Sequence, residues 1–152
     1  MGFFSKLLND TAESNVPRLQ NEAEAIMASL YAVAASDGVV SEVEVDFISR
    51  LCVFKQYFTG YDIVMQYEKA MVIHKKIGSQ RLIEMATPLI QAENRITVFL
   101  MILDVMFVDG VVEDEEEQII DFVSKKYGIL ESRAQDMVDI MLLRNKGNVK
   151  IA

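Results

Sequence analysis

Apolar residues recur at intervals of three and four over most of the chain, which is the spacing of one face of an α-helix. The first such stretch begins at Pro17, a residue suited to the first helical position, and stops after about position 36, before Asp37–Gly38. Similar stretches predict helices at about 41–55, 62–78, 79–87, 94–108 and 132–144, with one more between Gly110 and Tyr127. The pattern therefore predicts an all-α fold of about seven helices.

The same pattern divides the chain into three parts. Residues 1–16 form a short amphipathic lead, residues 17–144 form one helical domain, and the polar residues 145–152 form a tail that we expect to fray. The lead lacks the apolar stretch and cleavage site of a signal peptide. The most apolar stretch, at 98–108, contains Asp104 and is too short to cross a bilayer. We expect a cytoplasmic protein whose membrane association is at most peripheral.

Composition narrows the function classes. The 152 residues are 51% apolar, which is enough for one packed core without a disulfide or a metal. The net charge of −8 repels phosphate backbones and anionic lipids, so nucleic acid is excluded as a ligand. The single cysteine, Cys52, cannot form an intramolecular disulfide, in agreement with a reducing compartment.

One segment of the sequence is repeated. SDGVVSEVEVDFI at 36–48 aligns with VDGVVEDEEEQII at 108–120, so that Asp-Gly-Val-Val recurs intact. The apolar residues before each copy also align, and we expect all of them to be buried: Leu30 and Val33 in the first copy, Ile102 and Val105 in the second. The fold is therefore predicted to be built on two helix–acidic loop–helix repeats that pack with pseudo-twofold symmetry.

The acidic residues of these loops allow two interpretations. In the first, Asp-Gly forms the turn and the acids cap the next helix, as Ser41 and Glu44 would in a capping box. Capping alone explains the acids of the second copy less well. There Glu113 replaces the serine, and Asp109 together with the run 113–117 places six carboxylates close together without a lysine or arginine.

In the second interpretation the loops bind a hard cation such as Ca²⁺, Mg²⁺ or Mn²⁺, whose preferred ligands are oxygens. Asp37 with Glu44, and Asp109 with Glu116, would be the ligands on the two sides of each loop. Further acids stand close by: Glu42, Glu113 and Asp114. The spacing does not fit an EF-hand, and without a cluster of cysteines or histidines it does not fit zinc.

Helical geometry predicts that the acids of the second copy lie on different faces of their helix. Glu116 lies three and four residues before Ile119 and Ile120, so it should project toward the apolar side. Glu115 and Glu117 should instead lie at the surface.

Two copies of Asp-Gly-x-x-x-x-x-Glu, each between two helices, resemble the tellurite-resistance TerB family over nearly the whole chain. The resemblance implies a compact helical bundle in a cytoplasmic bacterial protein of the stress response. It also implies metal-binding acids, which carry over to Asp37, Glu44, Asp109 and Glu116. Other stress-response proteins are implied as partners, and similar domains serve as interaction modules in membrane-anchored proteins.

Catalytic chemistry is not indicated by the sequence. His74 is the only histidine and has no evident partner, so a structural role is expected. Asp104, inside an apolar helix, should either pair with a buried cationic group or face a polar cavity, and a structural salt bridge is favoured over a role in the site. We therefore expect a non-enzymatic protein that binds metal cations through its two loops. The alternative is a metal-independent adaptor that uses its acidic surface to bind a protein partner.

Overall fold

The computed structural model describes residues 16–108 and 112–148. These ranges contain six α-helices: α2 (Glu22–Ala34), α3 (Glu42–Val53), α4 (Ile63–Ala86), α5 (Arg95–Phe107), α6 (Asp114–Lys126) and α7 (Glu131–Arg144). Three short 3₁₀ helices join them: η1 (Gln56–Phe58), η2 (Thr87–Leu89) and η3 (Ala92–Asn94). No strand occurs in the described ranges, which confirms the all-α prediction. None of the helices described is both long enough and apolar enough to cross a membrane.

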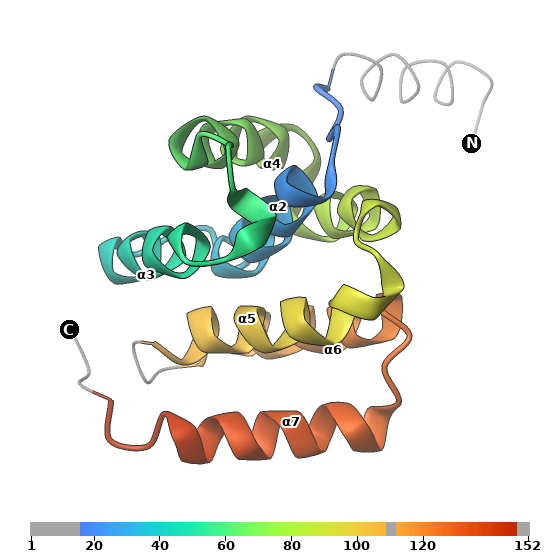
Figure 1. Ribbon diagram of the computed structural model, residues 1–152. Coiled ribbons are helices and arrows are strands. Elements are labelled where there is room, and N and C mark those ends of the chain that lie inside the picture. Colours follow the sequence, from blue (N-terminus) through green and yellow to red (C-terminus); the bar gives the residue numbers. More distant parts are fainter. Residues whose placement is uncertain (1–15, 109–111, 149–152) are drawn as a thin grey trace.

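Helix α2 forms the centre of the structure and contacts α3, α4, α5 and α6 (Figure 1). All of its residues are buried except Glu22 and Glu24 at its first turn, because alanines and larger apolar residues alternate around its whole surface. A helix that is apolar on all sides is stable only inside a core. The small alanines let the neighbouring helices approach closely, so α2 is the element around which the others pack.

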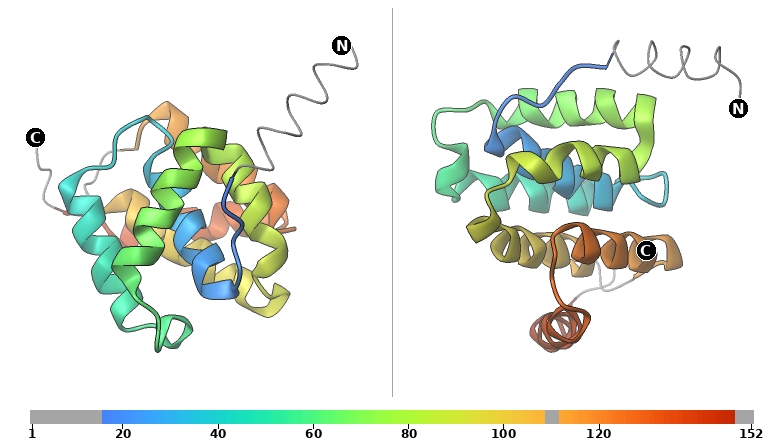
Figure 2. Two further views of the ribbon diagram at one scale, coloured as in Figure 1. Left: turned by 90° about the horizontal axis from the view of Figure 1, so that it is seen from above. Right: turned by 90° about the vertical axis from the view of Figure 1, so that its right-hand side faces the viewer.

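The remaining helices lie in layers (Figures 1 and 2). Helices α3 and α4 surround α2 in the upper layer, α5 and α6 form the layer below, and α7 lies beneath both and packs mainly on α5. The four residues predicted to be core from the repeat are all fully buried: Leu30, Val33, Ile102 and Val105. That prediction is confirmed.

The boundary predicted at Gly78 appears as a kink inside α4. Gly78 has φ 81° and ψ 176°, a backbone conformation that a residue with a Cβ adopts only at a cost. The chain remains helical on both sides, so the predicted third and fourth helices are two segments of one bent element. The structure therefore has six α-helices in its described part where the sequence predicted seven.

The predicted start of the first helix at Pro17 is wrong, because α2 begins at Glu22. The Asn21 side chain accepts a hydrogen bond of 2.8 Å from the backbone N–H of Glu24 and so caps the helix there. Conversely, Asn94 precedes α5 as expected but makes no cap. Its side-chain amide donates to both carboxylate oxygens of Glu22, at 3.0 and 3.2 Å, and ties α2 to the start of α5.

Candidate functional site

The first acidic loop connects α2 to α3. Asp37 is exposed, and its Oδ1 accepts a hydrogen bond of 3.0 Å from the backbone N–H of Val39. Gly38 has φ 93°, which lets the chain turn directly after the end of α2. Glu42, one of the further acids considered as ligands, is also exposed. The carboxylate of Asp37 thus stabilises the turn of its own loop.

Glu44 lies on the opposite side of this loop and is only 6% exposed. One of its carboxylate oxygens accepts from the backbone N–H of Ser41, and the Ser41 hydroxyl accepts from the N–H of Glu44, both at 3.1 Å. This is the predicted capping box, and it is confirmed. The nearby charge of Glu44 also contributes, after burial and Tyr31, to the raised pKa of Tyr67.

The second acidic loop repeats this arrangement where it can be described. Asp109 lies outside the described residues, so the predicted pairing of Asp109 with Glu116 is not tested. Glu116 is 5% exposed, and its Oε1 accepts a hydrogen bond of 3.2 Å from the backbone N–H of Glu113. Glu113 thus occupies the position of Ser41 in the first copy, and Glu116 that of Glu44.

The other acids of α6 point away from the core. Asp114, Glu115 and Glu117 are exposed in the first turn of the helix, and Glu113 is exposed just before it. The predicted division between an inward Glu116 and outward Glu115 and Glu117 is therefore confirmed. The inward carboxylate caps the helix, and the outward ones form a dense negative surface.

This geometry bears on the predicted cation ligands. Among the residues that the structure describes, no three or more His, Cys, Asp or Glu side chains are grouped so that they could hold a metal ion. Asp37 bonds within its own turn, and Glu44 bonds to the start of its own helix. A complete ligand set would need Asp109 or backbone carbonyls in addition.

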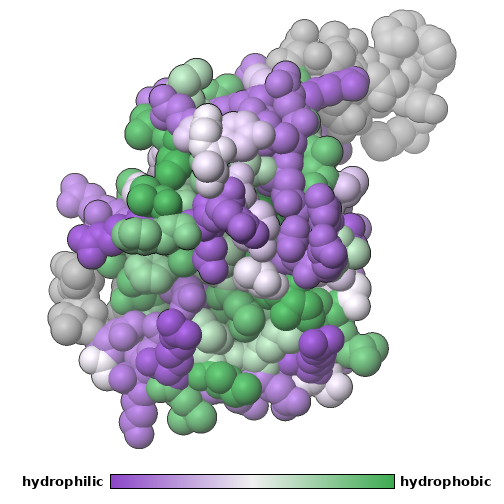
Figure 3. Space-filling view, viewed as in Figure 1, coloured by the Kyte–Doolittle hydropathy of each residue, from purple (hydrophilic) through white to green (hydrophobic). Residues whose placement is uncertain are grey.

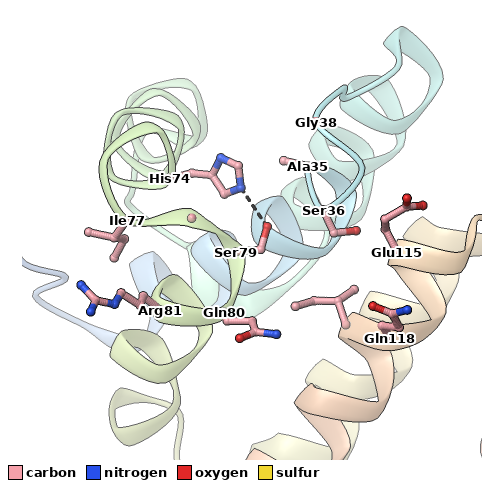
Figure 4. Close-up of a pocket in the computed structure, with 12 residues that line it drawn as sticks. Ala35, Ser36, Gly38, His74, Ile77, Ser79, Gln80, Arg81, Glu115 and Gln118 are labelled. Carbon is pink, nitrogen blue, oxygen red and sulfur yellow. Dashed lines mark hydrogen bonds between the residues drawn. The ribbon is translucent and has the colours of Figure 1, made fainter.

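Two polar side chains meet at the kink of α4 (Figure 4). His74 Nε2 lies 2.8 Å from Ser79 Oγ, and the edge of the His74 ring meets Tyr31 with 5.4 Å between centroids. Burial lowers the pKa of His74, so its ring is neutral at pH 7. Sequence reasoning missed Ser79 as a partner, because residues five apart come together only where Gly78 bends the helix.

The pair borders an open pocket of about 570 Å³ between the first acidic loop, the kink of α4 and the first turns of α6. Ser36, Arg81, Glu115 and Gln118 are among the residues that line it.

A second hollow, of about 790 Å³, is a groove between α5, α6 and α7. Apolar residues of all three helices form its floor and walls: Phe99, Leu103, Met106, Phe107, Ile120, Ala134, Val138 and Leu142. Four carboxylates also line it: Asp114, Glu117, Asp121 and Glu131. No lysine or arginine lines this groove in the part of the chain that the structure describes.

Asp104 does not make the predicted salt bridge. Within the described ranges no lysine or arginine nitrogen lies within 4.0 Å of its carboxylate. Burial raises the pKa of Asp104, and the more distant charges of Arg144 and Lys55 oppose this shift. Burial therefore disfavours the ionised form of Asp104, and the charges of Arg144 and Lys55 only partly offset this cost.

Comparisons of the chain with family models, with curated proteins and with solved structures find no match. The resemblance to the TerB family therefore rests on the residues of the two Asp-Gly loops.

Proposed function

We propose that this chain is a non-enzymatic interaction module that binds a basic protein partner through the acidic surface of α6. The observation that carries this proposal is that the acidic residues in the first turn of α6 divide into one that caps the helix and three that face solvent. Glu116 alone faces inward and caps the helix, whereas Asp114, Glu115 and Glu117 face solvent. Clustered charge of one sign accelerates association with a partner of the opposite sign and selects against others.

The repeat supports a TerB-like architecture for this module. The two copies place Glu44 and Glu116 in the same relation to their helices, and Leu30 and Ile102 in the same fully buried position. We infer that α2–α3 and α5–α6 are the two repeated units. A role in the bacterial response to tellurite or other stress in the cytoplasm is then the context that the resemblance implies.

A lysine-rich peptide without apolar residues tests the acidic surface directly. We expect fluorescence anisotropy to show binding that weakens as NaCl is added and that EDTA does not change. The E115K/E117K variant should bind more weakly than E68K/E93K, which changes the net charge equally at exposed positions on α4 and η3. Equal weakening by both variants, or no binding at low salt, would contradict a local partner surface on α6.

The second candidate function is cation binding by the two loops, as the sequence predicts. It is supported by the matching positions of Glu44 and Glu116, whose carboxylates both turn back toward the loop that precedes their helix. Oxygen ligands from Asp109 and from backbone carbonyls of the second loop would complete a site for Ca²⁺, Mg²⁺ or Mn²⁺.

The melting temperature separates the two candidates. A cation that binds only the folded protein stabilises it by RT ln(1 + [L]/Kd), so millimolar Ca²⁺, Mg²⁺ or Mn²⁺ should raise the midpoint. Glu116→Gln should remove this shift, because an amide can still accept the capping hydrogen bond but carries no charge. Glu115→Gln, one residue away and exposed, is the matched control. No shift with any of the three ions would leave the adaptor as the function.

A further inference from the structure

We propose that the groove between α5, α6 and α7 binds an amphipathic helix of the partner protein, with lysine or arginine residues flanking its apolar face. This inference rests on the proposed function and names where, and by which structural class of segment, the basic partner is recognised. It is carried by the groove's shape, by its apolar floor and by the charge of its border.

The groove is shaped to accept a helix. Helices α6 and α7 form a hairpin through the short connection 127–130, and α5 closes the floor between them. Seen almost end-on in the right panel of Figure 2, α7 lies below the layer of α5 and α6. An added helix would pack its side chains into the rows of both neighbours, which is how amphipathic helices bind apolar grooves.

Helix α7 leaves apolar surface uncovered. Only Ala134 and Met141 of its residues are buried, whereas Leu142 is 50% exposed at the groove and Leu143 is 72% exposed outside it. Hydrophobic residues also continue over the surface of the lower layers in Figure 3. Exposed apolar surface bordered by polar residues is typical of an interaction site.

The negative charge at the border of the groove favours a basic partner helix. Asp114 and Glu117 stand on α6, and Glu131 stands at the start of α7. Asp121 pairs with Lys125 at 2.9 Å, and the charge of Glu131 also acts on Lys125. Both side chains of that pair are more than half exposed, so the pair is weak and can exchange for a partner cation. An acidic or neutral helix would leave Asp114 and Glu117 without a compensating charge, whereas a basic helix would pair with them.

The test uses a labelled synthetic helix with leucines at i, i+3, i+4 and i+7 and lysines at the flanking positions. A scrambled peptide of the same composition, and a peptide with glutamate in place of lysine, serve as ligand controls. Binding is measured by fluorescence anisotropy on the full chain. Each protein variant is first checked by circular dichroism for an unchanged fold.

Two matched pairs of variants locate the site. Leu142→Asn should weaken binding about tenfold, whereas Leu143→Asn, the next residue on α7, should change it less than about twofold. D114K/E117K should weaken binding about tenfold as well, whereas the control E68K/E93K, with the same net charge, should have a small effect. All of the substituted side chains are exposed, so the fold should tolerate these changes.

The outcomes separate this inference from the proposed function. If the scrambled peptide binds as tightly as the helix and Leu142→Asn has no effect, the groove is not the site, but a basic partner can still bind the acidic surface. If no basic peptide binds at low salt, both proposals are wrong. If Leu142→Asn instead dissociates a dimer in sedimentation experiments while the peptides do not bind, a second copy of the chain occupies the groove and the inference is overturned.

Discussion

Reversing the charge of Glu117 should stabilise the protein, whereas reversing the charge of Glu115 should destabilise it. Both residues are exposed in the first turns of α6, and both lose a favourable interaction with the helix dipole, about 0.3–1 kcal/mol each, when they become lysine. That loss is larger for Glu115, because the dipole effect falls off within the first turn. The difference between the variants therefore depends on their neighbours.

Glu117 has three acidic neighbours at helical spacing: Glu113, Asp114 and Asp121. Each like-charge pair costs about 0.2–0.5 kcal/mol, and reversal turns each repulsion into a similar attraction. The gain for Glu117→Lys is then about 1–3 kcal/mol before the dipole loss is subtracted. Lys125 already compensates Asp121 at 2.9 Å, so the lower part of this range applies.

Glu115 has no such neighbours in the described residues. Its helical partners in α6 are Gln118 and Ile119, which carry no charge, so Glu115→Lys loses the dipole interaction and gains little. We expect Glu117→Lys to be more stable than Glu115→Lys by about 1–2 kcal/mol, with the wild type between them.

Urea unfolding followed by circular dichroism measures the difference. At low ionic strength the midpoint should be highest for Glu117→Lys, with the same m-value for all three proteins. In about 1 M NaCl, where the Debye length is about 3 Å, the three midpoints should converge. A reversed order at low salt, or a difference that persists in high salt, would refute the assignment of the effect to charges on α6.

Three further predictions concern the core. Leu30→Ala should lower the free energy of unfolding by about 2–5 kcal/mol, because Leu30 is fully buried, and a loss below about 1 kcal/mol in urea unfolding would contradict the central position of α2. Burial raises the pKa of Asp104, so the Asp104 carboxyl group holds its proton more tightly in the folded protein than in the unfolded chain. Asp104→Asn should therefore raise the melting temperature at pH 7, and this advantage should shrink as the pH falls through the folded pKa toward the unfolded value; an advantage that grows on acidification would be contrary. The Cys52 thiol is fully buried with its pKa raised to about 12, so it should react with Ellman's reagent in urea and only slowly in buffer.

Much of the fold could be predicted because its signals are local. The helical spacing of apolar residues identified Leu30 and Ile102 as core, since one face of a helix must be buried. The capping box of Ser41 and Glu44 was also visible, because its two residues are three positions apart. A local capping signal was also present at Asn21, three residues before Glu24. This cap sets the start of α2, although Pro17 is also suited to a first helical position.

The candidate site could not be predicted in the same way, because its members come from distant parts of the chain. Glu117 and Leu142 meet at one groove only through the packing of α6 against α7. The effect of Lys55 on Asp104 likewise depends on how α3 meets α5. Sequence periodicity gives the face of a helix on which a residue lies, but not which face of another helix it meets.

The two copies of the repeat, read against each other, show which acids the fold requires. Each copy keeps one buried glutamate, Glu44 or Glu116, whose carboxylate bonds to the start of its own helix. Where the first copy has the partly buried Val43 and Val45, the second has the exposed Glu115 and Glu117. Capping needs neither charge, and Glu117 is repelled by the acids at helical spacing on α6. The Glu115 charge is favourable at the start of α6 through the helix dipole, whereas the Glu117 charge lowers stability and is the one that the proposed partner surface would account for.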